Sequence, residues 1–422
     1  MLSNLFPPGF IGGYELGAFD TARGLAANGH EVEVLTSDYF PDDAGVLTDL
    51  PVRRILQCAG LNRIPSDHAG LVDAAFIVQR NLRLLAAEIA RFRPDRVLCF
   101  NLAGLGAWGM LQFLVAAGYR PVLFLMDNVF EAMAASAGRR PAFTQSFGAG
   151  HWLDQVHCVF MSQNLRHEVE TALGLSLTRS SLIPGWTNPD PAAAVAAEPW
   201  TLSHTGDGPL RLIFASRITG HKGIDTILAA ARTLLDRGQG NFRIDVFGAG
   251  EVAQMLQTVA ALQLQDHVHY RGCPPKEVLL ASYADYHALL FPTWPREPFG
   301  FVVSEAAVAG CLPVMTAGIG AAEWFLNGQD ALLIRNDEKG VVTAMLQLML
   351  MPAAERDAMR RRARQTALRF FGFPAALGRL DAVLAASAGD AEMQGPMAIR
   401  RTRAAEAALS ILTEVWRSSR HD

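Results

Sequence analysis

The alternation of short apolar runs with longer amphipathic segments is the feature that most constrains the fold of this chain. Four runs in the first half have the length and composition of buried parallel strands: HEVEVLT (30–36), DRVLCF (95–100), PVLFLM (121–126) and VHCVFM (156–161). Helix-like segments at 14–29 and 71–92 alternate with them, and the first ends on a glycine stop. This order predicts βαβ units, and hence an α/β fold with helices on both faces of a parallel sheet.

The same rhythm restarts after an irregular segment. Residues 185–210 are rich in Pro, Gly, Asp, Ser and Ala without periodicity, which predicts a linker. Beyond it we expect strands at 210–216, 242–248, 267–272, 286–292 and 312–316, and helices at 223–237, 251–264 and from about 300. The prediction is two Rossmann-like domains whose parallel sheets face each other across a deep interdomain cleft. Its divisions are 1–187, a linker at 188–209, 210–370, a helix at 371–387 that packs back across the domains, and a tail at 388–422 with a terminal helix.

Composition limits the classes of binding partner and the cellular compartment that we expect for this chain. The formal net charge of −4 over 422 residues gives no electrostatic case for nucleic-acid binding. Five cysteines lie without paired or metal-ligand spacing, so we expect reduced thiols in a cytoplasmic protein, and no metal site. The chain opens without a signal peptide, and no apolar run approaches the roughly 20 residues of a membrane span. A peripheral contact with the inner face of the membrane stays open. The basic segment 360–373 could make it, although it also fits a helix that packs across both domains.

Glycine turns stand at matching places in the two halves. GGYELGAFDTARGL (12–25) and HKGIDTILAAARTL (221–234) each put glycine between the first strand and the first helix. Backbone N–H groups and the positive end of a helix dipole favour a phosphate at such a position. One such turn alone is more often an ordinary strand-to-helix connection, whereas two in matching places favour a ligand site.

Two cations stand beside the second of these turns. In ASRITGHKGID (215–225), Arg217 ends a predicted strand and Lys222 precedes the glycine before the helix. Strand ends in an open α/β sheet point into the ligand crevice, and two cations at a helix N-terminus suit a diphosphate. A solvated basic loop is the alternative. It is weakened because lysine is rare here: of 37 basic residues only Lys222, Lys276 and Lys339 are lysines.

Two carboxylates stand in the apolar stretch WPREPFGFVVSEAAVAGCLP (294–313). Glu297 is predicted in a loop before a helix, and Glu305 inside that helix. Carboxylates accept hydrogen bonds from paired hydroxyls, so the two glutamates could hold different parts of one ligand that carries vicinal diols. The alternative is a loop acid plus a helical glutamate paired to an arginine. An unpaired carboxylate in an apolar helix is costly, so Glu305 needs a partner, and ligand hydroxyls could supply it.

The same segments carry a family resemblance. REPFGFVVSEAAVAGCLPV, together with ASRITGHKGIDTILAAARTLL and GIGAAEWFLNGQDALLI (318–334), closely resembles the donor-binding domain of the retaining family-4 glycosyltransferases (glycosyl transferases group 1) of GT-B fold. LSNLFPPGFIGGYELGAFDTARGLAANGHEVEVLT resembles the acceptor-side domain of the same family. The likeness runs from residue 1 to about 385, and the two glutamates around Pro-Phe-Gly are its most specific element.

The resemblance implies a role for each matching residue. Arg217 and Lys222 would hold the donor diphosphate and stabilise it as it leaves, while Glu297 would contact donor-sugar hydroxyls near the reacting carbon. Glu305 would take the ribose hydroxyls. The remaining expected donor contacts are backbone groups of Phe299, Gly300 and Phe301, and of Gly12 and Gly13 from the opposite domain.

The resemblance also implies the reaction, with three departures. It predicts a hexosyltransferase-type enzyme of polysaccharide biosynthesis that moves a sugar from a nucleotide-sugar to a glycan, lipid-linked or small-molecule acceptor, with retention and without a metal or other cofactor. Met126 stands where the family often has a histidine, and we expect Asp127 to replace it as a catalytic residue. LIPGWTNP (182–189) replaces the usual Pro-Asn-Gly hinge, and MLSNL supplies only a reduced first strand, which suggests a shortened or mis-assigned start. An epimerase, a glycan phosphorylase and a catalytically silent sugar-nucleotide binder remain alternatives.

Overall fold

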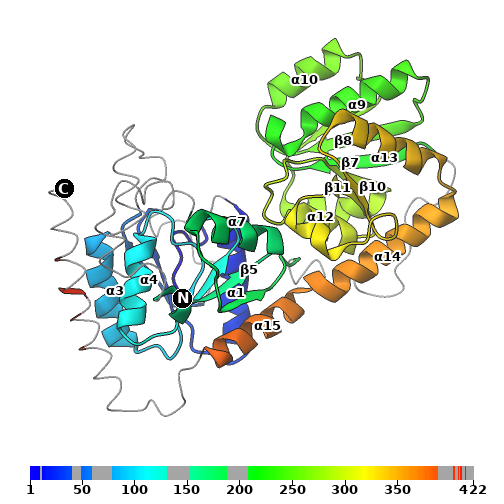
Figure 1. Cartoon of the computed structure of the whole chain (residues 1–422). Helices are drawn as coiled ribbons and strands as arrows, with labels where there is room; N and C mark the ends of the chain where they lie inside the picture. Colours follow the sequence, from blue (N-terminus) through cyan, green and yellow to red (C-terminus); the bar gives the residue numbers. More distant parts are fainter. Residues whose placement is uncertain are drawn as a thin grey trace. The chain divides into compact units, whose positions relative to one another are not determined.

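The computed structural model describes residues 1–9, 12–39, 49–58, 78–130, 152–187 and 208–387, with positions 403, 407, 409, 410 and 414 of the tail. The chain divides into two compact units (Figure 1). The first contains Met1–Met161, Leu165–Ile183 and Leu377–Asp422, and the second contains Ser162–Asn164 and Pro184–Ala376. Most of the predicted linker 188–209 and of the predicted tail helix lies outside the described residues, and the predicted interdomain cleft stays a prediction.

Parallel strands form the sheet of the first unit. In chain order they are β1 (Val34–Ser37), β2 (Val52–Leu56), β3 (Leu98–Cys99), β4 (Val122–Leu125), β5 (His157–Phe160) and β6 (Ser180–Leu182). β1 pairs with β2, and β3, β4, β5 and β6 follow one another in a second ladder. The sequence pattern does not predict β2 or β6, because most of their residues are only half-buried and their composition is polar.

The expected weak first strand is present as a single bridged residue. Leu2 forms isolated parallel bridges with Leu35 of β1 and Cys99 of β3. The Leu2 N–H donates to Leu98 O at 2.8 Å, and the Phe100 N–H donates to Leu2 O at 2.9 Å. Residue 2 therefore joins the two ladders, and its side chain is buried in the core of this unit.

Helices cover this sheet. They are α1 (Gly13–Ala27), α3 (Gln79–Phe92), α4 (Ala107–Ala116), most of α7 (Gln163–Leu173) and the short η2 (Leu153–Gln155). In α3 the buried residues Leu82, Leu85 and Ile89 recur at the spacing of one helix face, which is why this segment packs as an amphipathic helix. Residues 71–77 of the predicted helix 71–92 lie outside the described residues.

The sheet of the second unit has six parallel strands in the order β12-β11-β10-β7-β8-β9. Their bounds are β7 (Leu210–Ala215), β8 (Phe242–Phe247), β9 (Val268–Gly272), β10 (Ala288–Phe291), β11 (Leu312–Thr316) and β12 (Leu332–Ile334). Every residue of β10 and of β11 is buried, which explains why both read as continuous apolar runs. The order reverses between β7 and β10, so this unit has the topological switch point of a doubly wound fold.

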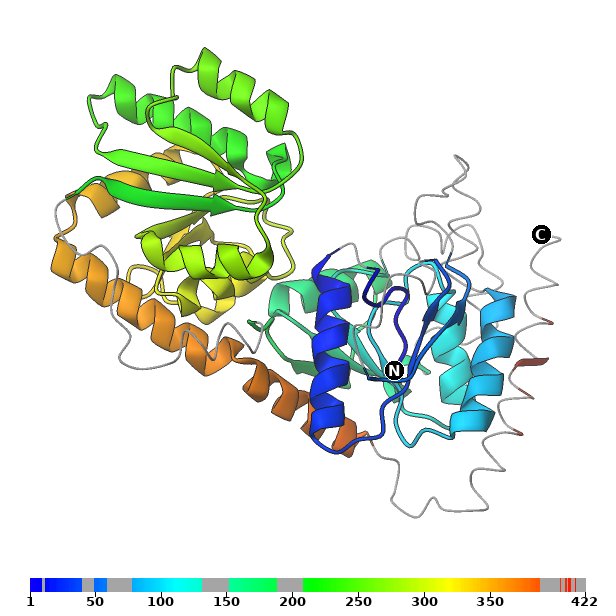
Figure 2. The ribbon, with the colours of Figure 1, turned by 180° about the vertical axis from the view of Figure 1, so that it is seen from behind.

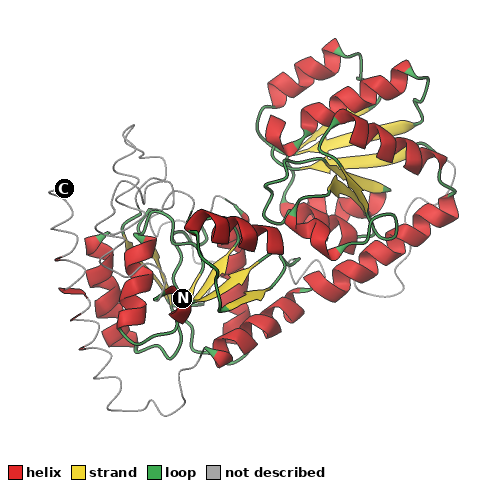
Figure 3. Ribbon diagram, viewed as in Figure 1, coloured by secondary structure: helices red, strands yellow, loops and turns green. Residues whose placement is uncertain are grey.

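The helices of the second unit lie on both faces of that sheet (Figures 1 and 2). Those before the motif glutamates are η3 (Gly220–Lys222), α9 (Ile224–Asp236), α10 (Val252–Ala261), α11 (Lys276–Ser282) and η4 (Tyr283–Asp285). Those after Glu297 are α12 (Phe301–Val308), η5 (Gly320–Trp324), α13 (Glu338–Leu350), α14 (Ala353–Phe371) and α15 (Phe373–Ala386), which ends in the first unit. α13 packs on α9 and α14 packs on α12, so the strands form a layer between helices (Figure 3).

The predicted basic segment 360–373 belongs largely to α14, in which some arginines are buried and others, Arg361, Arg362 and Arg369, are exposed. Arg356, Arg360 and Arg364 are buried in this unit. The Arg360 guanidinium donates to Gly310 O at 2.8 Å and to Tyr286 O at 3.1 Å. Arg360 therefore ties α14 to the turn after α12 and to the segment before β10, while Arg356 donates to Leu348 O of α13 at 3.2 Å. Within the described ranges, no helix is long and apolar enough to cross a membrane.

Candidate active site

The loop after β7 carries both predicted diphosphate ligands. Residues Gly220–Lys222 form a 3₁₀ turn, and Gly223 follows as the N-cap of α9 with φ +86°. A Cβ atom at Gly223 would lie 2.1 Å from Pro292 O, so only glycine fits. The sequence signal for a glycine turn is thereby explained: this glycine lets the β7 loop approach the loop that follows β10.

Hydrogen bonds fix these two loops together at the carboxyl ends of the strands. His221 O accepts from the Trp294 N–H at 2.9 Å and from Thr293 Oγ1 at 3.2 Å. Thr316 Oγ1, at the end of β11, donates to Thr293 O at 2.6 Å. Three strand ends thus hold one rigid platform, at the edge of the sheet where α/β proteins bind ligands.

Lys222 and Glu297 form an ion pair on this platform. The Lys222 ammonium contacts Glu297 Oε2, and the two side chains are only 13% and 14% exposed. The same ammonium lies 5.9 Å from the centroid of the Phe291 ring. Both residues were predicted in the site, but their direct contact was not.

Arg217 is placed differently from Lys222. It lies just beyond β7, is exposed, and forms no hydrogen bond or ion pair with any residue that the structure describes. The field of the two cations is visible at His221, whose pKa is lowered first by desolvation and then by the charges of Lys222 and Arg217. An anion would find one paired and one unpaired cation here.

The Pro-Phe-Gly segment is braced by the loop that contains η5. Gly320 N donates to Glu297 O at 3.1 Å, and Ala321 N donates to Phe299 O at 2.9 Å. Gly300 is the N-cap of α12 with φ +92°, and a Cβ there would lie 2.9 Å from Phe291 Cε1. These contacts fix the direction in which α12 begins.

The start of α12 leaves backbone donors available. The N–H groups of Gly300 and Phe301 have no acceptor among the residues described. The Phe299 ring is 1% exposed and packs against Phe301 and Phe371 at centroid distances of 5.6 and 5.4 Å. Phe299 is thus a core residue, and only its backbone could touch a ligand.

Glu305 has a protein partner that the sequence reading missed. Its Oε1 lies 3.2 Å from Lys276 Nζ, and the carboxylate is 9% exposed. We expected either ligand hydroxyls or an arginine to supply the partner, and the structure supplies a lysine from α11 instead. Burial raises the pKa of Glu305, while the charge and hydrogen bond of Lys276 oppose that shift. The scarcity of lysine was the signal that could have found it, since two of the three lysines pair with the two motif glutamates.

In the first unit, Tyr14 connects the predicted residues Gly12 and Gly13 with the carboxyl end of β4, where Met126 and Asp127 lie. Its hydroxyl donates to Phe124 O at 2.9 Å and accepts from the Met126 N–H at 3.0 Å. This ties the start of α1, with Gly12 and Gly13 just before Tyr14, to the carboxyl end of β4. Burial raises the pKa of Tyr14, and the charge of Asp127 raises it further, so that carboxylate is close by. Tyr14 was not predicted.

Gly12 leaves open space beside this strand end. Its N–H donates to Glu15 Oε2 at 2.9 Å, and a Cβ atom placed on it would meet nothing within 4 Å. Asp127 is exposed directly after β4. Glycine and carboxylate thus lie at the edge where a ligand of this unit would be expected.

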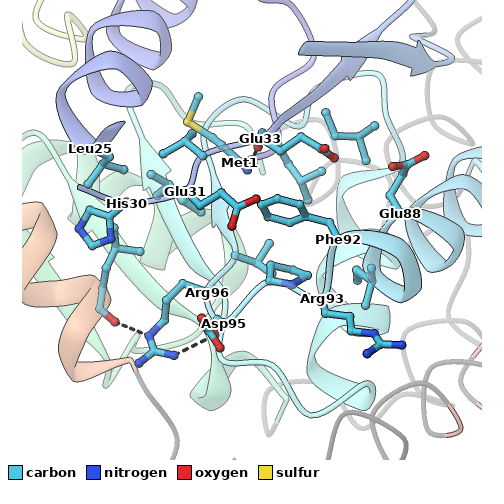
Figure 4. A pocket seen from close by; sticks show the side chains of 18 of the residues that line it. Met1, Leu25, His30, Glu31, Glu33, Glu88, Phe92, Arg93, Asp95 and Arg96 are labelled. Atoms are coloured by element: carbon cyan, nitrogen blue, oxygen red, sulfur yellow. Dashed lines mark hydrogen bonds between the residues drawn. The ribbon is translucent and has the colours of Figure 1, made fainter. Parts of the chain in front are cut away.

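A separate pocket in the first unit lies away from every predicted site residue (Figure 4). Its volume is about 250 Å³, and its wall includes Glu31, Glu33 and Arg96, near the amino ends of β1 and β3. The Arg96 side chain there donates to Leu384 O at 2.9 Å. The opposite ends of the strands carry Tyr14 and Asp127, so this pocket is not part of the candidate site.

No group of three or more metal-ligating side chains is found within the described ranges. Whether the reaction needs a metal is not tested by this finding, and the expectation of a metal-free reaction stays a prediction.

A family model decides the identity of the second unit. The model of glycosyl transferases group 1 matches residues 203–366, which span the β7 loop, both motif glutamates and most of α14. The chain carries a glycosyl transferases group 1 domain. The chain is also similar to an uncharacterized glycosyltransferase of Methanocaldococcus jannaschii, to which it is 22% identical over 329 residues, or 75% of this chain and 79% of that protein.

Solved structures support the fold around the group 1 domain. Sucrose-phosphate synthase of Thermosynechococcus elongatus superposes with a TM-score of 0.65 at 20% identity, over 89% of this chain and 94% of that one. The Anabaena HepE protein in complex with UDP-glucose gives a TM-score of 0.62 at 16% identity, over 91% and 98%. The predicted GT-B fold class is confirmed.

Proposed function

We propose that this protein transfers a sugar from a nucleoside-diphosphate sugar to an acceptor hydroxyl, with retention of anomeric configuration. One observation carries the proposal: in a group 1 domain, Lys222, Glu297 and the free N–H groups of Gly300 and Phe301 meet on one braced platform. Cations and helix N-termini recognise a diphosphate, and a carboxylate recognises sugar hydroxyls.

The geometry suits the charge that develops in the reaction. Breaking the anomeric C–O bond places negative charge on the leaving diphosphate and positive charge on the sugar ring. Arg217, Lys222 and the start of α12 are aimed at the first charge before it forms, which is electrostatic preorganisation. A diphosphate oxygen can then take the proton of the acceptor hydroxyl as the new C–O bond forms, so no further protein base is needed for retention.

The Lys222–Glu297 pair gives each side chain a role on ligand binding. In this structure the two charges neutralise each other. A diphosphate would draw the ammonium to its own oxygens, and the released Glu297 carboxylate would accept from donor-sugar hydroxyls. Glu305, one helix turn or more farther along α12, is proposed to hold the ribose hydroxyls.

A solved structure of similar fold supports the donor class of this proposal. A solved protein of this fold holds UDP-glucose, which supports a nucleotide-sugar donor. Gly12 and Gly13 remain predicted donor-binding residues of the first unit, and Asp127 remains a predicted catalytic residue. A cytoplasmic location, with or without a peripheral contact with the inner membrane face, remains part of the proposal.

The test is a screen of UDP-, ADP- and GDP-sugars for release of the nucleoside diphosphate, with mono- and oligosaccharide acceptors. We expect release that requires both a donor and an acceptor. Turnover of donor without acceptor would indicate an epimerase, and dependence on free phosphate would indicate a phosphorylase. Donor binding without turnover across the whole acceptor panel would indicate a silent binder.

A further inference from the structure

The ion pair between Lys276 and Glu305 has features that a chance surface pair lacks. Lys276 is the first residue of α11 and follows Pro274 and Pro275, so the backbone that carries it has little freedom. Glu305 projects from the eight-residue α12, whose residues from Val303 to Val308 are all buried. A buried carboxylate is therefore paired with one of only three lysines in the chain, whose own side chain is 39% exposed.

The surroundings of Glu305 contain little else that could hold its charge. Among the described residues, Lys276 is the one cation whose charge lowers the pKa of Glu305, and the hydroxyl of Tyr283 in η4 is close enough for the charge of Glu305 to raise its pKa. Tyr283 is fully buried, and its hydroxyl has no hydrogen-bond partner among the described residues. This neutral hydroxyl does not compensate a buried carboxylate, so removal of Lys276 would leave the charge of Glu305 uncompensated.

Lys276 contacts only one of the two oxygens of the Glu305 carboxylate. Lys276 takes Oε1, whereas Oε2 has no hydrogen bond with any residue that the structure describes. An ionised carboxylate offers about four lone-pair sites and acts only as an acceptor. Two hydroxyl donors of a ligand could therefore bind Glu305 while Lys276 stays in place.

We propose that Lys276 is a positioning residue, which keeps Glu305 ionised and oriented to accept two adjacent hydroxyls of a nucleoside diphosphate. This inference rests on the proposed function for the identity of the ligand. The coupling between Lys276 and Glu305 does not depend on the proposed function, because the two side chains form their ion pair without a ligand. Burial alone raises the pKa of Glu305, and Lys276 counters this effect.

Nucleotide binding tests whether Lys276 positions Glu305 for a ligand. UDP, ADP and GDP are titrated calorimetrically between pH 6 and pH 9 into wild-type protein, Lys276→Met, Lys276→Arg and Lys339→Met. Lys339 is the matched control, because it is the remaining lysine, exposed on α13. We expect Lys276→Met to bind about tenfold more weakly at pH 7, with the deficit shrinking as the pH rises and Glu305 ionises. Lys276→Arg should bind within about threefold of wild type, and Lys339→Met as wild type. A uniform deficit at every pH, or an equal loss in Lys276→Arg, would overturn the proposal.

Thermal unfolding tests the coupling without any nucleotide. A buried acid whose folded pKa is raised loses stability as the pH rises through that range, and Lys276→Met should raise the pKa further. The Tm deficit of Lys276→Met should therefore grow from pH 5 to pH 8, and it should stop growing in a Glu305→Gln background. A constant deficit in both backgrounds would contradict the coupling. If the coupling holds but none of the three nucleotides binds wild-type protein, the proposed function fails and the positioning of Glu305 for a nucleotide fails with it, while the ion pair stands.

Discussion

The Lys222 ammonium contacts the Glu297 carboxylate across 75 residues of sequence, from the end of one strand to the end of its neighbour in the sheet. Both side chains are mostly buried, so each compensates the charge of the other. A donor that binds the lysine through its diphosphate and the glutamate through its sugar would separate this pair. Binding and catalysis would then share two side chains whose charges are neutralised before the ligand arrives.

Glu297→Gln should separate binding from catalysis. The amide keeps the shape of the carboxylate but releases the Lys222 ammonium from its ion pair. We therefore expect a nucleoside diphosphate to bind several-fold more tightly, while sugar transfer falls by about 10²-fold, as on loss of one transition-state contact. Calorimetry and a turnover assay measure the two effects. Weaker nucleotide binding in this variant would argue against competition between Glu297 and the diphosphate.

Gly223→Ala should destabilise the second unit. The left-handed φ of +86° and the 2.1 Å approach of a new Cβ to Pro292 O leave no room for a methyl group. We expect the free energy of unfolding to fall by more than about 2 kcal/mol in chemical denaturation. The control is Gly238→Ala, with φ +71° but nothing within 4 Å of its Cβ, for which about 1 kcal/mol is expected. Equal losses would show that the close approach to Pro292 does not matter.

Gly12→Ala should leave folding nearly unchanged. The backbone there is extended, and a new Cβ meets nothing within 4 Å. We expect a change in unfolding free energy of less than about 1 kcal/mol. If the predicted donor contact at Gly12 is correct, the donor KM rises in the same variant. An unchanged KM would remove Gly12 from the donor site.

Thiol labelling should single out Cys273. It is exposed in the loop before α11, whereas Cys99, Cys158 and Cys311 are buried, with burial raising each thiol pKa to about 12. The half-buried Cys58 also has its pKa raised to about 12 by burial. The thiolate is the nucleophile, so iodoacetamide at pH 8 should alkylate Cys273 at least tenfold faster than the others. Peptide mass spectrometry gives the order, and early modification of a buried cysteine would contradict the packing described here.

Much of the fold could be predicted because the decisive signals are local. Each predicted range from β7 to β11 includes the observed strand, and all of these strands except β9 (VHYRG) are largely apolar. β2, β6 and β12 were not predicted. Arginines interrupt β2, serines make up most of β6, and β12 is only three residues long, so no long apolar run marks any of them.

The candidate site could be predicted only in part, for a different reason. Arg217, Lys222, Glu297 and Glu305 could be named from motifs within one segment each. Their partners could not, because the contacts of Glu305 with Lys276, and of Tyr14 with β4, join residues that are distant in sequence. Only the folded chain brings those residues together.

The most direct test of the central claim, a diphosphate site at the β7 loop, is calorimetric titration of UDP, ADP and GDP into wild-type protein and three variants. The variants are Arg217→Ala, Lys222→Ala and the matched control Lys339→Ala. We predict that at least one nucleotide binds wild-type protein and Lys339→Ala alike, and that each of the other two variants binds it at least tenfold more weakly. Equal affinity in all four proteins would contradict the site proposed here.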